Sequence, residues 1–166
     1  MPIAGPPLDK PIVIKDLLKT GLDANPDAPA LVAHDLSWTW RELDAASSRV
    51  AANLSRLGLN PGDRVASLMP TRTALVIFYL ACLKAGLVAT PLNYRYQAPE
   101  IDHALEVSGA SILLAHAERD ADLAKSKLAG QLPLGQIVFG GEAGRSPSFE
   151  ELLDNEPDSP DLPEPD

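Results

Sequence analysis

The chain has 166 residues, of which 45% are hydrophobic and 22% are charged, and its formal net charge is −9. This length and balance suit one globular domain with its own core and exclude a disordered chain, while the acidic surface argues against nucleic acid or an anionic membrane as a partner. The single cysteine, Cys82, excludes an intrachain disulfide and fits a cytoplasmic protein, and no apolar run reaches the ~20 residues that span a bilayer.

The N-terminal part predicts short elements separated by prolines. Residues 1–11 hold four of the 16 prolines and are expected to form an extended arm. Residues 12–22 suit a short helix that Gly21 would end, and the prolines of residues 25–29 forbid its continuation. Two short strands, at residues 30–33 and 36–38, are predicted around a turn.

The clearest helix begins at Thr39. A threonine followed three residues later by Glu42 is a capping box, in which each side chain satisfies a free backbone amide of the first helical turn. Apolar residues then follow at intervals of three and four and form one stripe: Leu43, Ala46, Val50, Leu54 and Leu57. Polar side chains such as Ser55 fall off the stripe, and Gly58 is expected to end the helix.

After this helix, strands and helices alternate. Strands are predicted at residues 64–68, 87–91, 111–115 and 136–139. Helices are predicted at residues 71–85, 99–107 and 118–129, with a last helical turn at 149–153. Strands that alternate with helices at this spacing are typical of parallel strands with right-handed crossovers. The expected fold class is therefore α/β, with a three-layer, doubly wound, mostly parallel sheet.

The usual catalytic motifs are missing from the sequence. It contains neither glycine-rich phosphate-binding pattern, and for the glycine-rich residues 140–145 a surface turn is favoured over an anion loop. The three histidines, His34, His103 and His116, form no metal-binding pair and are expected at exposed positions. Cys82 lies in an apolar run, which predicts an inert core thiol.

Arg95 stands apart because it follows a predicted strand. Ligands of open parallel sheets bind beyond the carboxyl ends of the strands, so an arginine there can face an anion. The residues alone leave a second interpretation open, in which Arg95 stacks on Tyr94 or Tyr96 and pairs with Glu100.

A series of short motifs runs through residues 25–110. They are NPDAPAL (25–31), SWTWREL (37–43), LG (57–58), PGDRVA (61–66), LKAG (83–86), PLN (91–93), EI (100–101), Leu105 and SGA (108–110). In this order and spacing they resemble the adenylate-forming superfamily, which comprises AMP-forming acyl-CoA synthetases, luciferases and the adenylation domains of peptide synthetases.

The resemblance implies an incomplete N-terminal part of the superfamily's large domain. The phosphate loop that holds ATP is expected soon after residue 166, so no residue of this chain is expected to be catalytic or to bind a metal, and the chain alone is expected to be inactive. The parent enzyme would use ATP and Mg²⁺ to turn a carboxylic acid into an acyl-adenylate and would then transfer the acyl group to CoA. In some such ligases an arginine at the position of Arg95 contacts CoA phosphates, which makes Arg95 the one candidate cofactor contact.

Within the superfamily, residues 93–96 favour a fatty-acyl or aryl CoA ligase. Peptide-synthetase adenylation domains usually show aspartate and then Tyr-Pro after the Pro-Leu pair, whereas this chain has Asn93 and Arg95. Tyr94, where proline is frequent, departs from the pattern. Two alternatives stay open, namely a peptide-synthetase adenylation domain and a stand-alone, non-catalytic α/β interaction module.

The domain organisation follows from composition. We expect an arm at 1–11, an α/β subdomain at 12–154, and a linker at 155–166 that leads to the phosphate-loop segment. Residues 156–166 carry five carboxylates and four prolines, which cannot pack a core. A sheet cut from a larger domain leaves a strand edge open, so we also expect the chain to form a homodimer or larger species.

Overall fold

The computed structural model describes residues 16–33, 36–142 and 144–156. The expected arm at residues 1–11 lies outside these ranges, and so do His34 and all but the first two residues of the expected linker.

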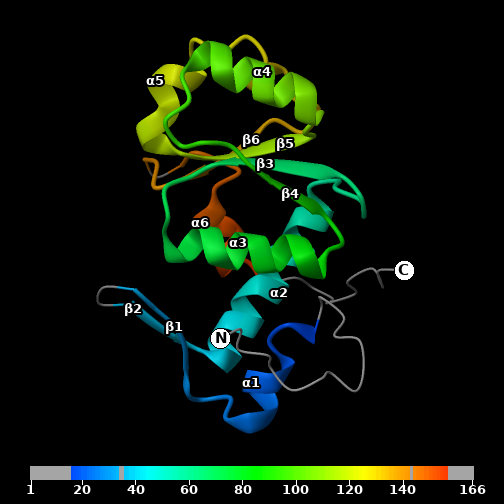
Figure 1. Cartoon of the computed structure of the whole chain (residues 1–166), viewed down its shortest axis with the longest axis vertical. Helices are drawn as coiled ribbons and strands as arrows, with labels where there is room; N and C mark the ends of the chain where they lie inside the picture. The colour runs from blue at the N-terminus through cyan, green and yellow to red at the C-terminus, as the bar shows by residue number, and fades with distance from the viewer. Residues whose placement is uncertain (1–15, 34–35, 143, 157–166) are drawn as a thin grey trace, which may run out of the picture.

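A four-stranded parallel sheet forms the centre of the chain, with the strand order β4-β3-β5-β6 (Figure 1). Its strands are β3 (Arg64–Leu68), β4 (Val88–Pro91), β5 (Ile112–His116) and β6 (Gln136–Phe139). Each lies within one residue of its predicted position. Every residue of β5 is buried, because β5 lies inside the sheet and helices cover both faces.

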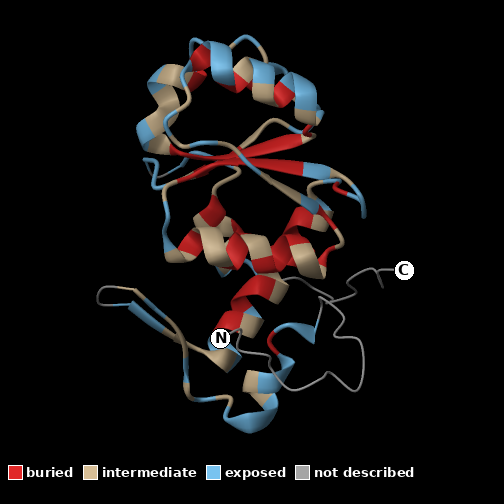
Figure 2. Cartoon of the chain, viewed as in Figure 1, coloured by how far each residue is buried: buried red, intermediate tan, exposed pale blue. Residues whose placement is uncertain are grey.

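Helices flank the sheet on both sides and make three layers. They are α2 (Trp40–Arg56), α3 (Thr73–Lys84), α4 (Ala98–Ser108), α5 (Asp120–Leu123) and α6 (Phe149–Asp154). Figure 1 shows α4 and α5 on one face of the sheet and α2, α3 and α6 on the other. Buried residues gather between these layers (Figure 2), in a larger core on the α2–α3 side and a smaller one under α4. The three-layer, doubly wound α/β fold is confirmed.

Helix α2 has the predicted cap and a wider buried face than predicted. Thr39 and Glu42 form the capping box, and four of the five stripe residues are buried. Asn53 is also buried, and its side-chain amide donates to the carbonyls of Leu152 (3.0 Å) and Asn155 (2.9 Å) at the end of α6. A pattern of apolar residues misses such a position, because Asn53 is buried through its hydrogen bonds.

At the N-terminus the predicted pair of strands is confirmed, and the predicted bounds of the first helix are wrong. Strands β1 (Pro29–Ala33) and β2 (Leu36–Thr39) form an antiparallel pair, as predicted. Helix α1 (Lys19–Ala24) begins later than predicted, and Gly21 lies inside it instead of ending it. Gly21 is needed there for close packing, because a Cβ atom on it would lie 2.2 Å from the Trp40 ring. Of the residues predicted to be helical, 12–15 lie outside the described ranges.

The helix predicted at residues 118–129 is wrong. The chain instead forms a short 3₁₀ turn, η2 (Ala117–Arg119), the four-residue α5, a turn, and a second 3₁₀ turn, η3 (Ala129–Gln131). The carboxylate of Asp102 on α4 accepts hydrogen bonds from the Ser126 hydroxyl (2.5 Å) and from the backbone N–H groups of Lys127 (3.1 Å) and Leu128 (3.0 Å). These bonds give the backbone an alternative to the helical pattern, and they lower the pKa of Asp102.

Candidate functional site

The carboxyl edge of the parallel sheet brings together segments that follow three different strands. Strands β3 and β4 pair in parallel with Ser67 opposite Pro91, and the Leu92 N–H donates to the Ser67 carbonyl at 2.9 Å. Strand β5 pairs with the other side of β3. Residues after β4 and after β5 therefore leave the sheet at the same edge, which is where parallel α/β sheets bind ligands.

Arg95 lies in the segment that follows β4, and its side chain is exposed. Its backbone N–H donates to the Asn93 side-chain oxygen at 3.0 Å, which fixes the turn locally. Within the described ranges, its guanidinium makes no hydrogen bond or ion pair. The pairing with Glu100 that the residues left open does not form, because Glu100 accepts the N–H of Gln97 at 2.8 Å in the capping box of α4.

Tyr94 is held by two residues of η2. Its hydroxyl donates to the Glu118 carboxylate at 2.7 Å, and the Arg119 guanidinium lies 5.3 Å from the centre of its ring. Arg119 therefore takes the stacking position that was considered for Arg95. Burial, followed by the bond to Glu118, raises the pKa of Tyr94, and the same hydrogen bond is the main cause that lowers the pKa of Glu118.

His116 is buried, and the prediction that it is exposed was wrong. It is the last residue of β5, the inner strand between β3 and β6, and only 8% of it is exposed. Its Nδ1 accepts the Glu118 N–H at 3.1 Å, and its ring meets Phe139 edge-on with 5.5 Å between the centres. A Cβ atom on Gly140 would come within 3.0 Å of its Nε2, which favours glycine there. His103 is exposed as predicted.

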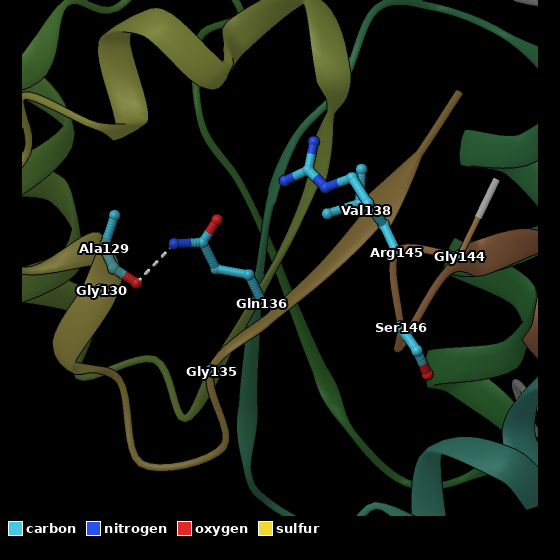
Figure 3. A pocket seen from close by; sticks show the side chains of 8 residues that line it. All are labelled: Ala129, Gly130, Gly135, Gln136, Val138, Gly144, Arg145 and Ser146. Carbon is cyan, nitrogen blue, oxygen red and sulfur yellow. Dashed lines mark hydrogen bonds between the residues drawn. The ribbon is translucent and has the colours of Figure 1, made fainter. Parts of the chain in front are cut away.

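An open pocket of about 490 Å³ lies at the far end of the sheet beside β6 (Figure 3). Its polar groups already have partners within the chain. The side-chain amide of Gln136 donates to the Ala129 carbonyl at 2.9 Å, and Arg145 forms an ion pair with Asp120. The neighbouring Gly140 N–H donates to Glu150 at 2.8 Å. Residues 140–142 and 144–145 are exposed, as expected for a surface turn, and we assign no ligand to this pocket.

Two findings concern metal ions and membranes. Within the described ranges, no group of three or more His, Cys, Asp or Glu side chains could bind a metal ion, so we assign none of them to Mg²⁺. No helix in those ranges has the length and apolar character to cross a membrane.

Cys82 is fully buried in the core on the α2–α3 side, as predicted, and burial raises the pKa of its thiol to about 12. Because the thiolate is the reactive form, we expect native protein to react with a maleimide far more slowly than protein in 6–8 M urea. Mass spectrometry of timed samples measures this. Complete labelling of the native chain within minutes would contradict a buried Cys82.

The comparisons with known proteins decide the family. The model of the family described as AMP-binding enzyme matches residues 18–166. This chain belongs to the AMP-binding enzyme family. The match covers nearly all of the described residues, including the parallel sheet and its flanking helices.

Relatives of this chain include a CoA synthase and a peptide synthetase. It is 39% identical over 142 residues to a feruloyl-CoA synthase from an Amycolatopsis species, a match that covers 84% of this chain and 26% of that protein. It is 37% identical over 98 residues to phosphinothricin tripeptide synthetase PhsC from Streptomyces viridochromogenes, covering 59% of this chain and 9% of that one. The chain thus spans about a quarter or less of the length of these two relatives.

A solved structure confirms the fold. The Mycobacterium tuberculosis fatty acyl CoA synthetase superposes with a TM-score of 0.76 at 27% sequence identity, over 91% of this chain and 29% of that one. This agreement confirms the predicted fold class.

Proposed function

We propose that this chain is the N-terminal portion of an ATP-dependent, AMP-forming CoA ligase that acts on a fatty or aryl carboxylic acid. The whole protein joins the acid to ATP with Mg²⁺, releases pyrophosphate, and passes the acyl group to CoA. Segments other than residues 1–166 supply the adenylation chemistry. The role of this chain is to form part of the large domain and to contact CoA. We place the enzyme in the cytoplasm.

The observation that carries the proposal is the unpaired guanidinium of Arg95 at the carboxyl edge of the sheet. A guanidinium can hold a phosphate through two parallel hydrogen bonds, and CoA carries several phosphate groups. Arg95 is exposed and makes no ion pair with a described residue, so its charge is available to a ligand. The similarity to a feruloyl-CoA synthase supports CoA as that ligand.

The domain organisation belongs to the same proposal. We propose that the α/β subdomain ends near residue 154, within the expected bounds of residues 12–154; the expected arm and most of the expected linker lie outside the described residues. Arg49 on α2 donates to the Leu153 carbonyl at 2.8 Å and pairs with Glu156, in the first part of the expected linker, at 2.5 Å. These bonds tie the last described residues to the subdomain.

A peptide-synthetase adenylation domain is the second candidate, because of the similarity to the tripeptide synthetase. Such a domain would activate an amino acid and would pass it to the thiol of a carrier protein instead of CoA. The sequence after the Pro91-Leu92 pair favours the CoA ligase, because Asn93 and Arg95 stand where peptide synthetases usually have aspartate and Tyr-Pro.

Exchange of radiolabelled pyrophosphate into ATP tests the proposal. The whole protein that contains residues 1–166 is assayed with a panel of fatty acids, cinnamic and benzoic acids and the 20 amino acids. We expect exchange with one or more fatty or aryl acids, and only background exchange for the 166-residue chain alone. Exchange that depends on amino acids only would favour the peptide-synthetase alternative, and exchange by the isolated chain would overturn our assignment of the chemistry to other segments.

We also propose that the isolated chain self-associates. Strands β4 and β6 are the edge strands of the described sheet. Part of β6 is covered, because the Val138 N–H donates to the Pro147 carbonyl at 3.1 Å, so β4 is the more open edge, and Val88 on it is 46% exposed. Open edges and exposed apolar side chains favour pairing between chains. Light scattering at tens of micromolar should give dimers or larger species. A uniform mass of 17.7 kDa across that range would contradict the proposal.

A further inference from the structure

Residues that follow β5 hold the segment that carries Arg95. The Tyr94 hydroxyl donates to Glu118 at 2.7 Å, and the Arg119 guanidinium covers the Tyr94 ring at 5.3 Å. On the other side of Arg95, an Nη atom of Arg119 donates to the Tyr96 carbonyl. Both neighbours of Arg95 are therefore anchored to η2, across the strand β3 that separates β4 from β5.

The carboxylates near this segment are engaged by groups other than Arg95. Glu118 accepts the Tyr94 hydroxyl, and Asp122 pairs with Arg119 at 3.0 Å. Glu100 caps α4 through the Gln97 N–H. The backbone on both sides of Arg95 is thus held in place while its guanidinium keeps no acidic partner among the described residues.

Tyr94 differs from a proline, whose ring would restrict the backbone by itself. A tyrosine restrains the backbone only where its side chain is held. The bond to Glu118 and the contact with Arg119 supply that restraint here. Restraining a loop in its binding conformation lowers the entropy lost when a ligand binds.

We propose that Tyr94 and Glu118 are positioning residues that hold the backbone around Arg95 so that its guanidinium is preorganised for a phosphate group of CoA. This inference rests on the proposed role of Arg95. Neither side chain touches CoA, and each acts through the conformation of residues 93–96.

The test uses the whole protein and removes one hydroxyl. Tyr94→Phe keeps the ring under Arg119 and loses the bond to Glu118. We expect the KM for CoA to rise about three- to tenfold, the size of one hydrogen bond, with little change in kcat or in pyrophosphate exchange. Glu118→Gln keeps an acceptor oxygen and should raise the KM less. Tyr79→Phe on α3 is the matched control, because no hydrogen bond to its hydroxyl is formed by the described residues, and it should leave the KM unchanged.

A double-mutant cycle shows whether Tyr94 acts through Arg95. In an Arg95→Ala background, Tyr94→Phe should change the KM for CoA by less than about twofold. An equal rise in both backgrounds would overturn the proposal, and so would a parallel loss of pyrophosphate exchange and melting temperature, which would indicate a general structural role.

Hydrogen exchange of the Arg95 amide gives a readout that needs no activity. Tyr94→Phe should speed its exchange while Tyr79→Phe does not. If the wild-type enzyme makes no acyl-CoA, the proposed function fails. The hydrogen-exchange measurement then decides by itself whether Tyr94 restrains residues 93–96. Equal hydrogen-exchange rates of the Arg95 amide in wild type and Tyr94→Phe would show that Tyr94 does not restrain the segment.

Discussion

Replacing Leu54 with alanine is expected to lower the free energy of unfolding by about 2–5 kcal/mol. Leu54 lies on α2 facing the larger core, and none of its side chain is exposed. Truncation removes apolar contacts and leaves a cavity that the rigid helix–sheet packing closes only in part. Urea denaturation of the 166-residue chain, followed by circular dichroism, measures the change.

Ser55→Ala is the control for Leu54→Ala. Ser55 is the next residue on α2, is half-buried, and bonds only to the carbonyl of Ala51 in its own helix at 3.3 Å. Its loss should change the free energy of unfolding by no more than about 0.5 kcal/mol. Equal losses at both positions would mean that α2 does not bury the face described above.

Replacing Arg95 with alanine is expected to raise the KM for CoA about tenfold to hundredfold, because one charge-assisted hydrogen bond contributes about 1.5–3 kcal/mol. The folding stability should change by only about 0.5 kcal/mol, since the side chain is exposed and has no described partner. Adenylate formation should keep its rate, because that step precedes CoA. The two half-reactions are measured separately in the whole protein.

Arg64→Ala is the matched control for Arg95→Ala. Arg64 is also exposed, and it begins β3 at the opposite end of the sheet from Arg95. Its loss should leave the CoA dependence unchanged. An unchanged KM in Arg95→Ala, or an equal loss of adenylate formation, would assign Arg95 to the protein surface instead of the CoA site.

The sheet could be predicted because its signals are local. Each strand is a short apolar run bounded by turn residues, and the capping box of Thr39 and Glu42 places the start of α2. The same logic failed at residues 118–129, where the decisive group is distant. Asp102 on another helix binds the turn at Ser126, and no pattern within residues 118–129 reveals this bond.

The candidate site could be predicted only in part. The strand pattern placed Arg95 at the carboxyl edge of the sheet, because β4 and its end were correct. The residues that hold its neighbour Tyr94 could not be foreseen, since Glu118 and Arg119 come from η2, more than 20 positions away in the chain. His116 was missed for a similar reason, because its burial depends on β6 pairing beside β5.

The most direct test of the central claim is to identify the acceptor of the activated acyl group. The whole protein is incubated with ATP, Mg²⁺ and the acid that supports the fastest pyrophosphate exchange, with and without CoA, and the products are separated by liquid chromatography and mass spectrometry. We predict that AMP and an acyl-CoA thioester accumulate in equal amounts and only when CoA is present. AMP formation that is indifferent to CoA, or that requires a carrier-protein thiol instead, would contradict the account.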